Sequence, residues 1–231
     1  MNSQNDYVSS EGIFLPRSGI SAIFLLKHRN KMKYIAEFIN NSILGLYYVP
    51  VPTSSYNITV YHIWKNKEPL TKLQLYRLQE LSKNNPDNYD RLLEQASHKS
   101  ELAINLLVKD LAMADHFLQS KIPMETTIVC NELCYDNHIF LNITWLDPKV
   151  GDYIKTTTSN LSTIFQTTGS VYSIGIMLGY KYKVIDEKHE SIIGQEIDRL
   201  GKMINIFDFT MILERPRIAS FNNTSDYKIF N

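Results

Sequence analysis

The sequence lacks an excess of either charge, and this absence limits the partners that composition can suggest. Lysine and arginine together number 24, aspartate and glutamate also number 24, and the formal net charge at pH 7 is zero. Proteins that bind duplex DNA or an anionic membrane over a broad surface usually carry a marked positive excess. We therefore expect neither partner, although a local basic patch is compatible with a neutral total.

Cysteine is scarce, with two residues in a chain of 231. Cys130 and Cys134 fall in one predicted strand, where four residues separate their Cα atoms by roughly 13 Å, beyond the reach of a disulfide. A zinc site would need more ligands at suitable spacing, and His138 is the only neighbour of the right type. We expect two free thiols, no metal site and no cofactor.

Motifs for phosphate binding and nucleophilic catalysis are also missing. The nine glycines are scattered and form no glycine-rich phosphate loop, and no Gly-x-Ser-x-Gly elbow is present. No apolar run approaches the roughly 18 residues that a transmembrane helix needs. Residues 1–12 are polar and acidic, unlike a signal peptide, and are expected to form a flexible tail. These features predict a cytoplasmic protein without membrane contact.

The composition that remains is typical of a packed globular protein, with 44% hydrophobic and 21% charged residues. Periodicity predicts helices at 31–42, 69–83, 89–121, 155–166 and 186–204. Runs rich in β-branched and aromatic residues predict strands at 19–27, 43–49, 56–63, 125–135, 138–146, 170–182 and 207–213. Residues 218–231 are expected to be an irregular tail. Because no regular βαβ period appears, residues 13–231 are expected to form one α+β domain with antiparallel sheets.

One predicted strand, at residues 56–63, carries a row of polar side chains. With a two-residue period, one face presents an amide, a hydroxyl and a phenol, from Asn57, Thr59 and Tyr61. The apolar residues do not all fit the other face; they are Ile58, Val60 and Ile63. A polar row in an apolar strand either faces solvent or lines a cleft, and taken alone this strand favours solvent.

Two runs resemble the signature strands of the 2H phosphoesterase (LigT-like) superfamily. Residues 50–60, Pro-Val-Pro-Thr-Ser-Ser-Tyr-Asn-Ile-Thr-Val, are similar to the first signature in an uncharacterised branch with the pattern Pro-x-Ser-Ser-Tyr-His-x-Thr. Residues 172–180, Tyr-Ser-Ile-Gly-Ile-Met-Leu-Gly-Tyr, resemble the second, His-x-Ser/Thr-Leu-x-Tyr, and residues 215–221 resemble the closing strand. The resemblance spans roughly residues 13–230. It implies two pseudo-symmetric lobes of antiparallel sheet with flanking helices around a central cleft.

In that family each histidine and the hydroxyl residue two positions on share a strand face, and the two imidazoles act as general base and acid. Here Asn57 stands at the first histidine position, while Thr59 keeps the hydroxyl. Gly175 and Met177 stand at the second pair of positions. An amide has no useful basic lone pair at neutral pH. Loss of both imidazoles should remove two acid–base contributions of about 10²–10⁴-fold each.

The resemblance therefore implies a catalytically degenerate protein with no catalytic residues at the signature positions. We expect its cleft to bind a nucleotide, an RNA end with a terminal or cyclic phosphate, or a protein partner. The ligand-binding candidates are Asn57, Thr59, Tyr61 and Tyr180. Positive charge could come from Lys181, Lys183 or Arg217.

Two alternatives remain open from the sequence. The chain could be an active cyclic-nucleotide or RNA 2′,3′-cyclic phosphodiesterase that recruits another histidine, of which His62 is the nearest. Strand alternation puts His62 on the face opposite Asn57 and Thr59 unless a bulge intervenes. The chain could also be an unrelated α+β protein whose Asn57 and Thr59 face water. The 2H interpretation requires these two residues to meet Gly175 and Met177 across one cleft.

Overall fold

A computed structural model describes residues 7–66, 68–98, 100–123, 125–167, 174–206, 210–223 and 225–230. One sheet contains β1 (Gly19–Leu25), β3 (Asn57–Lys65), β8 (Arg217–Asn223) and β9 (Asp226–Ile229). The other contains β2 (Tyr48–Pro50), β4 (Glu125–Tyr135), β5 (His138–Trp145), β6 (Gly175–Lys181) and β7 (Thr210–Glu214). The helices are α1 (Lys33–Asn41), α2 (Lys72–Ser82), α3 (Asn88–His98), α4 (Ser100–Asn105), α5 (Val108–Lys121), α6 (Pro148–Phe165) and α7 (Glu187–Ile206). Short 3-10 turns are η1 (Arg29–Met32), η2 (Ile43–Leu46) and η3 (Thr53–Ser55).

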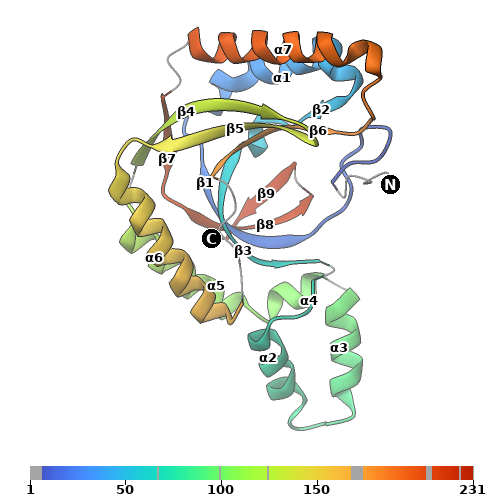
Figure 1. Ribbon diagram of the computed structural model, residues 1–231. Coiled ribbons are helices and arrows are strands. Elements are labelled where there is room, and N and C mark those ends of the chain that lie inside the picture. Colours follow the sequence, from blue (N-terminus) through green and yellow to red (C-terminus); the bar gives the residue numbers. More distant parts are fainter. Residues whose placement is uncertain are drawn as a thin grey trace.

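Both sheets are antiparallel throughout and form two lobes. Their strand orders are β3-β1-β8-β9 and β2-β6-β5-β4-β7. Helices α1 and α7 cover the outer face of the five-stranded sheet, while α5 and α6 lie against the other lobe (Figure 1). This arrangement confirms the predicted α+β class with two antiparallel lobes and flanking helices. Among the described residues, no helix combines the length and apolar composition needed to cross a membrane.

The helices that cover the sheets form because their apolar residues recur on one side. In α7 the buried residues are Ile193, Ile197, Leu200 and Ile204, spaced by four, three and four. In α1, Ile35 and Ile39 are fully buried one turn apart. Both stripes belong to the main hydrophobic core, so they hold α1 and α7 against the five-stranded sheet.

The single long helix predicted over residues 89–121 is wrong, because the chain forms α3, α4 and α5 there. The break lies at two adjacent leucines that pack in different places. Leu106 joins Leu78 and Ala96 in a small cluster among α2–α4, whereas Leu107 enters the main core. Residues 106 and 107 form the turn between α4 and α5, so the chain changes direction where it passes from one cluster to the other. Helices α2–α4 consequently form an arm beside the sheets (Figure 1).

Two predicted helix starts also need correction, and local capping explains both. Helix α6 begins at Pro148 rather than at residue 155, since the Asp147 side chain accepts a hydrogen bond from the Lys149 amide at 2.9 Å. Helix α2 begins after Thr71 rather than at Pro69. Thr71 and Gln74 form a capping box, with bonds of 3.2 and 2.8 Å between each side chain and the other's backbone amide.

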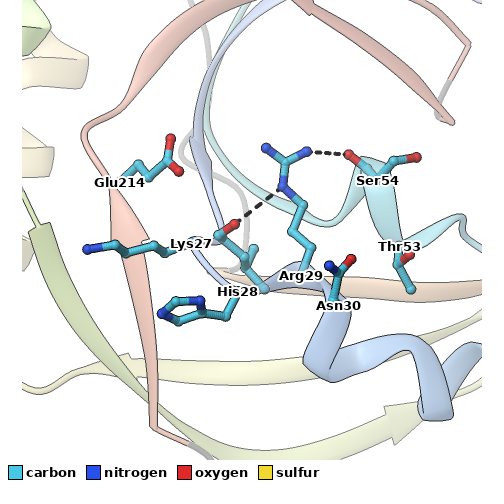
Figure 2. A pocket seen from close by; sticks show the side chains of 8 residues that line it. Lys27, His28, Arg29, Asn30, Thr53, Ser54 and Glu214 are labelled. Carbon is cyan, nitrogen blue, oxygen red and sulfur yellow. Dashed lines mark hydrogen bonds between the residues drawn. The ribbon is translucent and has the colours of Figure 1, made fainter.

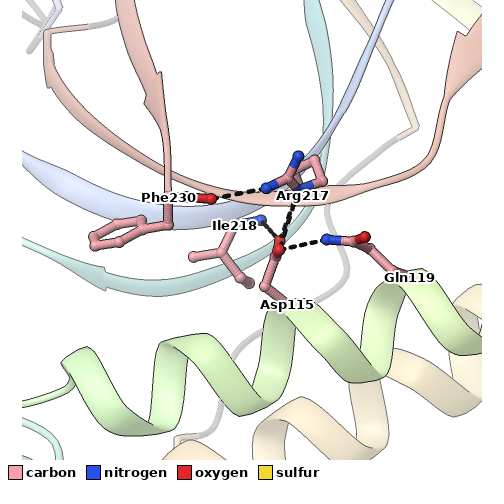
Figure 3. Close-up of polar contacts among 5 residues, drawn as sticks. All are labelled: Asp115, Gln119, Arg217, Ile218 and Phe230. Carbon is pink, nitrogen blue, oxygen red and sulfur yellow. Dashed lines mark hydrogen bonds and ion pairs between the residues drawn. The ribbon is translucent and has the colours of Figure 1, made fainter.

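The predicted irregular tail from residue 218 is instead β8 and β9 in the four-stranded sheet. A polar network anchors this end to α5 (Figure 3). Asp115 accepts hydrogen bonds from Arg217 Nε at 3.1 Å and from the Ile218 amide at 2.8 Å. Arg217 Nη2 also donates to the Phe230 carbonyl at 2.8 Å. One carboxylate therefore holds the start of β8, and the arginine extends that hold to the C-terminal end.

Part of the predicted N-terminal tail packs onto the domain. Val8 is 3% exposed and pairs with Phe14, and Tyr7 contacts Tyr180 of β6 and Arg17, which precedes β1. Residues 1–6 lie outside the described residues, as do 168–173, which include the start of the second signature run. Residues 207–209, the start of the last predicted strand, also lie outside them.

Candidate functional site

A cleft with a volume of about 420 Å³ lies between the two lobes. Among its lining residues are all four signature positions, Asn57, Thr59, Gly175 and Met177. Strand β3 contributes the first pair and β6 the second, so the two predicted strands meet across one hollow. The remaining lining residues are Tyr7, Arg17, Val51, Ser55, His62, Lys65, Glu68, His138, Phe140, Tyr180, Phe221 and Tyr227.

Two irregularities in β3 decide which of its side chains reach the cleft. Ile23 of β1 pairs with Thr59 and Ala22 pairs with Tyr61, so Val60 is an extra residue in β3. The register slips again after His62, which makes Ile63 a second extra residue. Each such bulge reverses the alternation that follows it. The residues of β3 on the cleft wall are consequently Asn57, Thr59, His62 and Lys65. This pattern also explains why the apolar residues did not fit one face of an ideal strand.

Strand β6 repeats this geometry in the other lobe. Ile139 pairs with Gly179 and Phe140 with Met177, so Leu178 is an extra residue. The cleft side of β6 consequently holds Gly175, Met177 and Tyr180, with the spacing of two and then three that β3 shows at Asn57, Thr59 and His62. Tyr180 thus occupies the position in its lobe that His62 occupies in the other.

The placement of Tyr61 differs from the prediction. Because the Val60 bulge turns it to the opposite face, its side chain is fully buried and its hydroxyl bonds with Thr167 Oγ1. Tyr61 is a core residue and not one of the cleft-lining residues. The three other ligand-binding candidates, Asn57, Thr59 and Tyr180, do line the cleft.

The side chain of Asn57 bonds with its own neighbours. Its Nδ2 donates to the Ser55 carbonyl at 2.7 Å, and its Oδ1 accepts from Thr59 Oγ1 at 3.2 Å. Burial raises the pKa of Tyr227 beside them, against the lowering effect of hydrogen bonds with Asn57 and Thr59. Asn57 is therefore part of a neutral hydrogen-bonded group.

Phe140 fills the space beside Gly175. A Cβ atom added to Gly175 would lie 2.3 Å from Phe140 Cζ and 2.5 Å from the Leu141 carbonyl oxygen. Real Cβ atoms do not approach other atoms so closely, and the carbonyl belongs to backbone that cannot swing away. The cleft wall at position 175 therefore has no room for a side chain.

Two imidazoles from outside the signature positions line the cleft, one from each lobe. His62 Nδ1 lies 2.8 Å from Ser21 Oγ in β1. Burial lowers the pKa of His62 to about 3, and the charges of Lys65 and Arg17 add to this effect. Burial also lowers the pKa of His138, against the charge of Asp136. Both rings are thus expected to be neutral at pH 7. The sequence pattern indicates His62 as a cleft residue only if a bulge intervenes, and it indicates His138 only as a neighbour of the cysteines.

The positive charge in the cleft comes from residues that sequence reasoning did not select. Arg17 precedes β1 and Lys65 ends β3, against a single lining carboxylate, Glu68. Glu68 Oε2 accepts from the Lys65 backbone amide at 3.2 Å. The predicted sources of charge, Lys181, Lys183 and Arg217, are not among the lining residues, and Arg217 instead pairs with Asp115. Arg17 lay in a predicted loop next to Pro16, so no strand pattern marked it.

Aromatic rings form much of the remaining wall. Tyr7 and Tyr180 stack with ring centroids 5.0 Å apart and an interplanar angle of 24°. The Arg17 guanidinium carbon lies 4.5 Å from the Tyr7 ring centroid. Phe221 and Tyr227 add a second pair, 5.3 Å apart. The described side chains include no group of three His, Cys, Asp or Glu residues positioned to hold a metal ion.

Comparisons with known proteins find relatives whose names assign no activity. The chain is 21% identical over 230 residues to "Uncharacterized protein 127L" of Invertebrate iridescent virus 6, covering 95% of this chain and 92% of that one. No protein-family model matches. The crystal structure of the conserved protein of unknown function ATU0111 from Agrobacterium tumefaciens superposes with a TM-score of 0.64 at 13% identity, over 100% of this chain and 90% of that one. Kluyveromyces marxianus Usb1 gives a TM-score of 0.40 at 8% identity, over 93% and 98%. At 13% identity the likeness to ATU0111 concerns the fold alone.

Proposed function

We propose that this protein is a catalytically degenerate 2H-phosphoesterase-like protein that binds a nucleotide or a phosphorylated RNA end in the cleft. The observation that carries the proposal is the meeting of the two signature strands across one hollow whose histidine positions hold Asn57 and Gly175. The strands keep the geometry of a site, and the residues at the two key positions cannot exchange protons.

The charges and rings of the cleft suit a ligand that joins a phosphate to an aromatic base. Arg17 and Lys65 outnumber the one lining carboxylate, and an anion gains from the excess. The neutral imidazole of His62 stands beside them. The rings of Tyr7 and Tyr180 offer stacking worth about 1–3 kcal/mol per base. A volume of about 420 Å³ lies within the range of small-molecule sites.

Binding can be measured by calorimetry and thermal shift with uridine 3′-monophosphate, using uridine as the ligand without a phosphate. We expect the monophosphate to bind and uridine to bind at least tenfold more weakly. Arg17→Gln should lower the affinity for the monophosphate about tenfold. Arg91→Gln, at an exposed position on α3, should leave that affinity unchanged. Equal affinity for both ligands would argue against a phosphate site.

Absence of turnover is the second part of the proposal. Incubation with 2′,3′-cyclic nucleotides and with short 2′-5′ and 3′-5′ oligonucleotides should release no product above the buffer blank. If a turnover is found and Thr59→Ala abolishes it, the degenerate interpretation is wrong.

An active phosphodiesterase is the second candidate, because His62 and His138 face the same cleft from opposite lobes. In that case one imidazole would take a proton and the other would give one. The candidate predicts that His62→Gln and His138→Gln each lower the hydrolysis rate of a 2′,3′-cyclic nucleotide at least 100-fold while binding persists. The lowered pKa of His62, about 3, makes it a weak base at neutral pH, so we rank this candidate second.

A further inference from the structure

A second pocket, with a volume of about 460 Å³, lies at the end of β1 and is separate from the cleft residues. Its lining residues are Leu26, Lys27, His28, Arg29, Asn30, Thr53, Ser54 and Glu214 (Figure 2). Three consecutive basic or titratable side chains, Lys27, His28 and Arg29, contribute to it. We call it the β1-end pocket.

Arg29 is the fixed cation of the β1-end pocket. Its Nη1 donates to the Ser54 carbonyl at 2.6 Å and its Nε donates to the Leu26 carbonyl at 3.3 Å. These two bonds hold the guanidinium between β1 and η3 (Figure 2). Both acceptors are uncharged, and no ion pair joins Arg29 to a carboxylate within the described part of the chain. Its charge is therefore positioned without being neutralised.

The two halves of the β1-end pocket differ in charge. On one side Arg29 stands with the amide of Asn30 and the residues of η3, Thr53 and Ser54 (Figure 2). On the other side lies the carboxylate of Glu214, near Lys27, which is itself paired with Glu125. Lys27 and its partner offset each other, so an anion would be held on the Arg29 side, where amide and hydroxyl groups can add hydrogen bonds.

The β1-end pocket and the cleft share a wall. Turn η3 is three residues long, and its first two residues line the β1-end pocket while Ser55 lines the cleft. Leu25, the last residue of β1, pairs with Asn57 in the cleft wall, and Leu26 begins the β1-end pocket. Arg29 and Ser55 both fix η3, since the Ser55 hydroxyl donates to the Ser225 carbonyl. A chain that leaves the cleft across η3 enters the β1-end pocket directly.

We infer that the β1-end pocket is a second anion subsite that takes an adjoining backbone phosphate of a single-stranded oligonucleotide whose terminal phosphate lies in the cleft. The inference rests on the proposed function, and it assigns the substrate class as oligonucleotide rather than mononucleotide. A single nucleotide fills the cleft alone, whereas an oligonucleotide gains the interaction with Arg29.

The test compares uridine 3′-monophosphate with a 3′-phosphorylated uridine tetranucleotide by calorimetry. We expect the tetranucleotide to bind about tenfold or more tightly than the monophosphate. Arg29→Gln should remove most of that gain and leave the monophosphate affinity unchanged. It should also lower the slope of log K against log salt for the tetranucleotide by about 0.7. Arg29→Lys, which keeps the charge, should retain part of the gain.

Because Arg29 also supports η3, Asn30→Asp serves as a second variant. This substitution keeps the shape of the side chain and leaves the Arg29 hydrogen bonds intact, but it adds a negative charge at an exposed position in the β1-end pocket. We expect Asn30→Asp to lower the affinity for the tetranucleotide and to leave the affinity for the monophosphate unchanged. Asn84→Asp makes the same change at an exposed position in the loop after α2 and should have no effect.

Each outcome separates the subsite from the proposed function. If the monophosphate binds but the tetranucleotide binds no better, or if Asn30→Asp weakens both equally, the subsite is overturned and the cleft proposal stands. If neither ligand binds the unchanged protein, both proposals fail.

Discussion

At the scale of single residues, the cleft contains an imidazole held in its neutral form. Burial, with the charges of Lys65 and Arg17, lowers the pKa of His62 from 6.5 to about 3. Between those values the unfolded chain binds a proton that the folded protein does not bind. Folding stability from this group therefore rises with pH: it is fully present above pH 6.5 and is lost as the pH falls toward 3.

The His62→Gln variant should be less sensitive to acid than the unchanged protein. Between pH 6.5 and 5 the decrease in the free energy of unfolding that His62 causes amounts to at most about 2 kcal/mol, or about 1.4 kcal/mol for each pH unit. Urea unfolding at pH 7, 6 and 5 measures it as the difference in slope between the two proteins. His116→Gln, at an exposed position on α5, should keep the original slope. A variant at His62 with the same slope as the unchanged protein would show that the ring is not the titrating group.

Gly175 gives a second prediction at the residue scale. Gly175→Ala should lower the free energy of unfolding by about 1–3 kcal/mol, because the added methyl group meets Phe140 and the Leu141 carbonyl. In a protein that already carries Phe140→Ala, Gly175→Ala should lower the free energy of unfolding by less. The double-mutant cycle should then show a favourable coupling of about 0.5–3 kcal/mol. Gly201→Ala is the control, since nothing lies within 4 Å of its added Cβ atom. In α7 that change should stabilise the protein by about 0.4–1 kcal/mol. Additive effects of the Gly175 and Phe140 changes would contradict the filled-space explanation.

At the scale of elements, the bulges in β3 and β6 determine the site. A strand with strict alternation would direct Tyr61 into the cleft and His62 away from it. The extra residue at Val60 exchanges them, and the extra residue at Ile63 then brings Lys65 to the same wall. Bulges depend on the pairing with a neighbouring strand, so a single strand's sequence does not contain them.

The join between α5 and β8 gives a prediction at the element scale. Asp115→Asn should lower the free energy of unfolding by roughly 2–4 kcal/mol, because the neutral amide leaves Arg217 without its counter-charge and places donors against the Ile218 amide (Figure 3). Asp152→Asn makes the same change in an exposed pair with Lys155, 3.8 Å apart, and should alter stability by less than about 0.5 kcal/mol. Chemical denaturation of the two variants measures the contrast, and equal effects would remove Asp115 from this role.

At the scale of the whole molecule, the sequence predicted the class of fold and the two strands that line the cleft. These rest on local signals, namely β-rich runs, the hairpin turn at Asp136 and the order of the signature runs. It could not predict the break at Leu106 and Leu107, which depends on two cores competing for neighbouring residues. Nor could it predict Arg17 and Tyr7 in the cleft wall, since both come from a segment without strand or helix periodicity.

The N-terminal segment joins the two lobes across the cleft, and this gives the last prediction. Tyr7 stacks on Tyr180 of β6, and the Arg17 amide bonds with the Asn222 carbonyl of β8 at 2.8 Å. Tyr7→Ala removes an aromatic pair worth about 0.5–1.5 kcal/mol and one wall of the proposed nucleotide site. We expect a lower melting temperature and a loss of about tenfold in affinity for uridine 3′-monophosphate. Tyr76→Ala, at a side chain 53% exposed on α2, should change neither quantity. A lower melting temperature with unchanged affinity would restrict Tyr7 to joining the lobes and remove it from the ligand site.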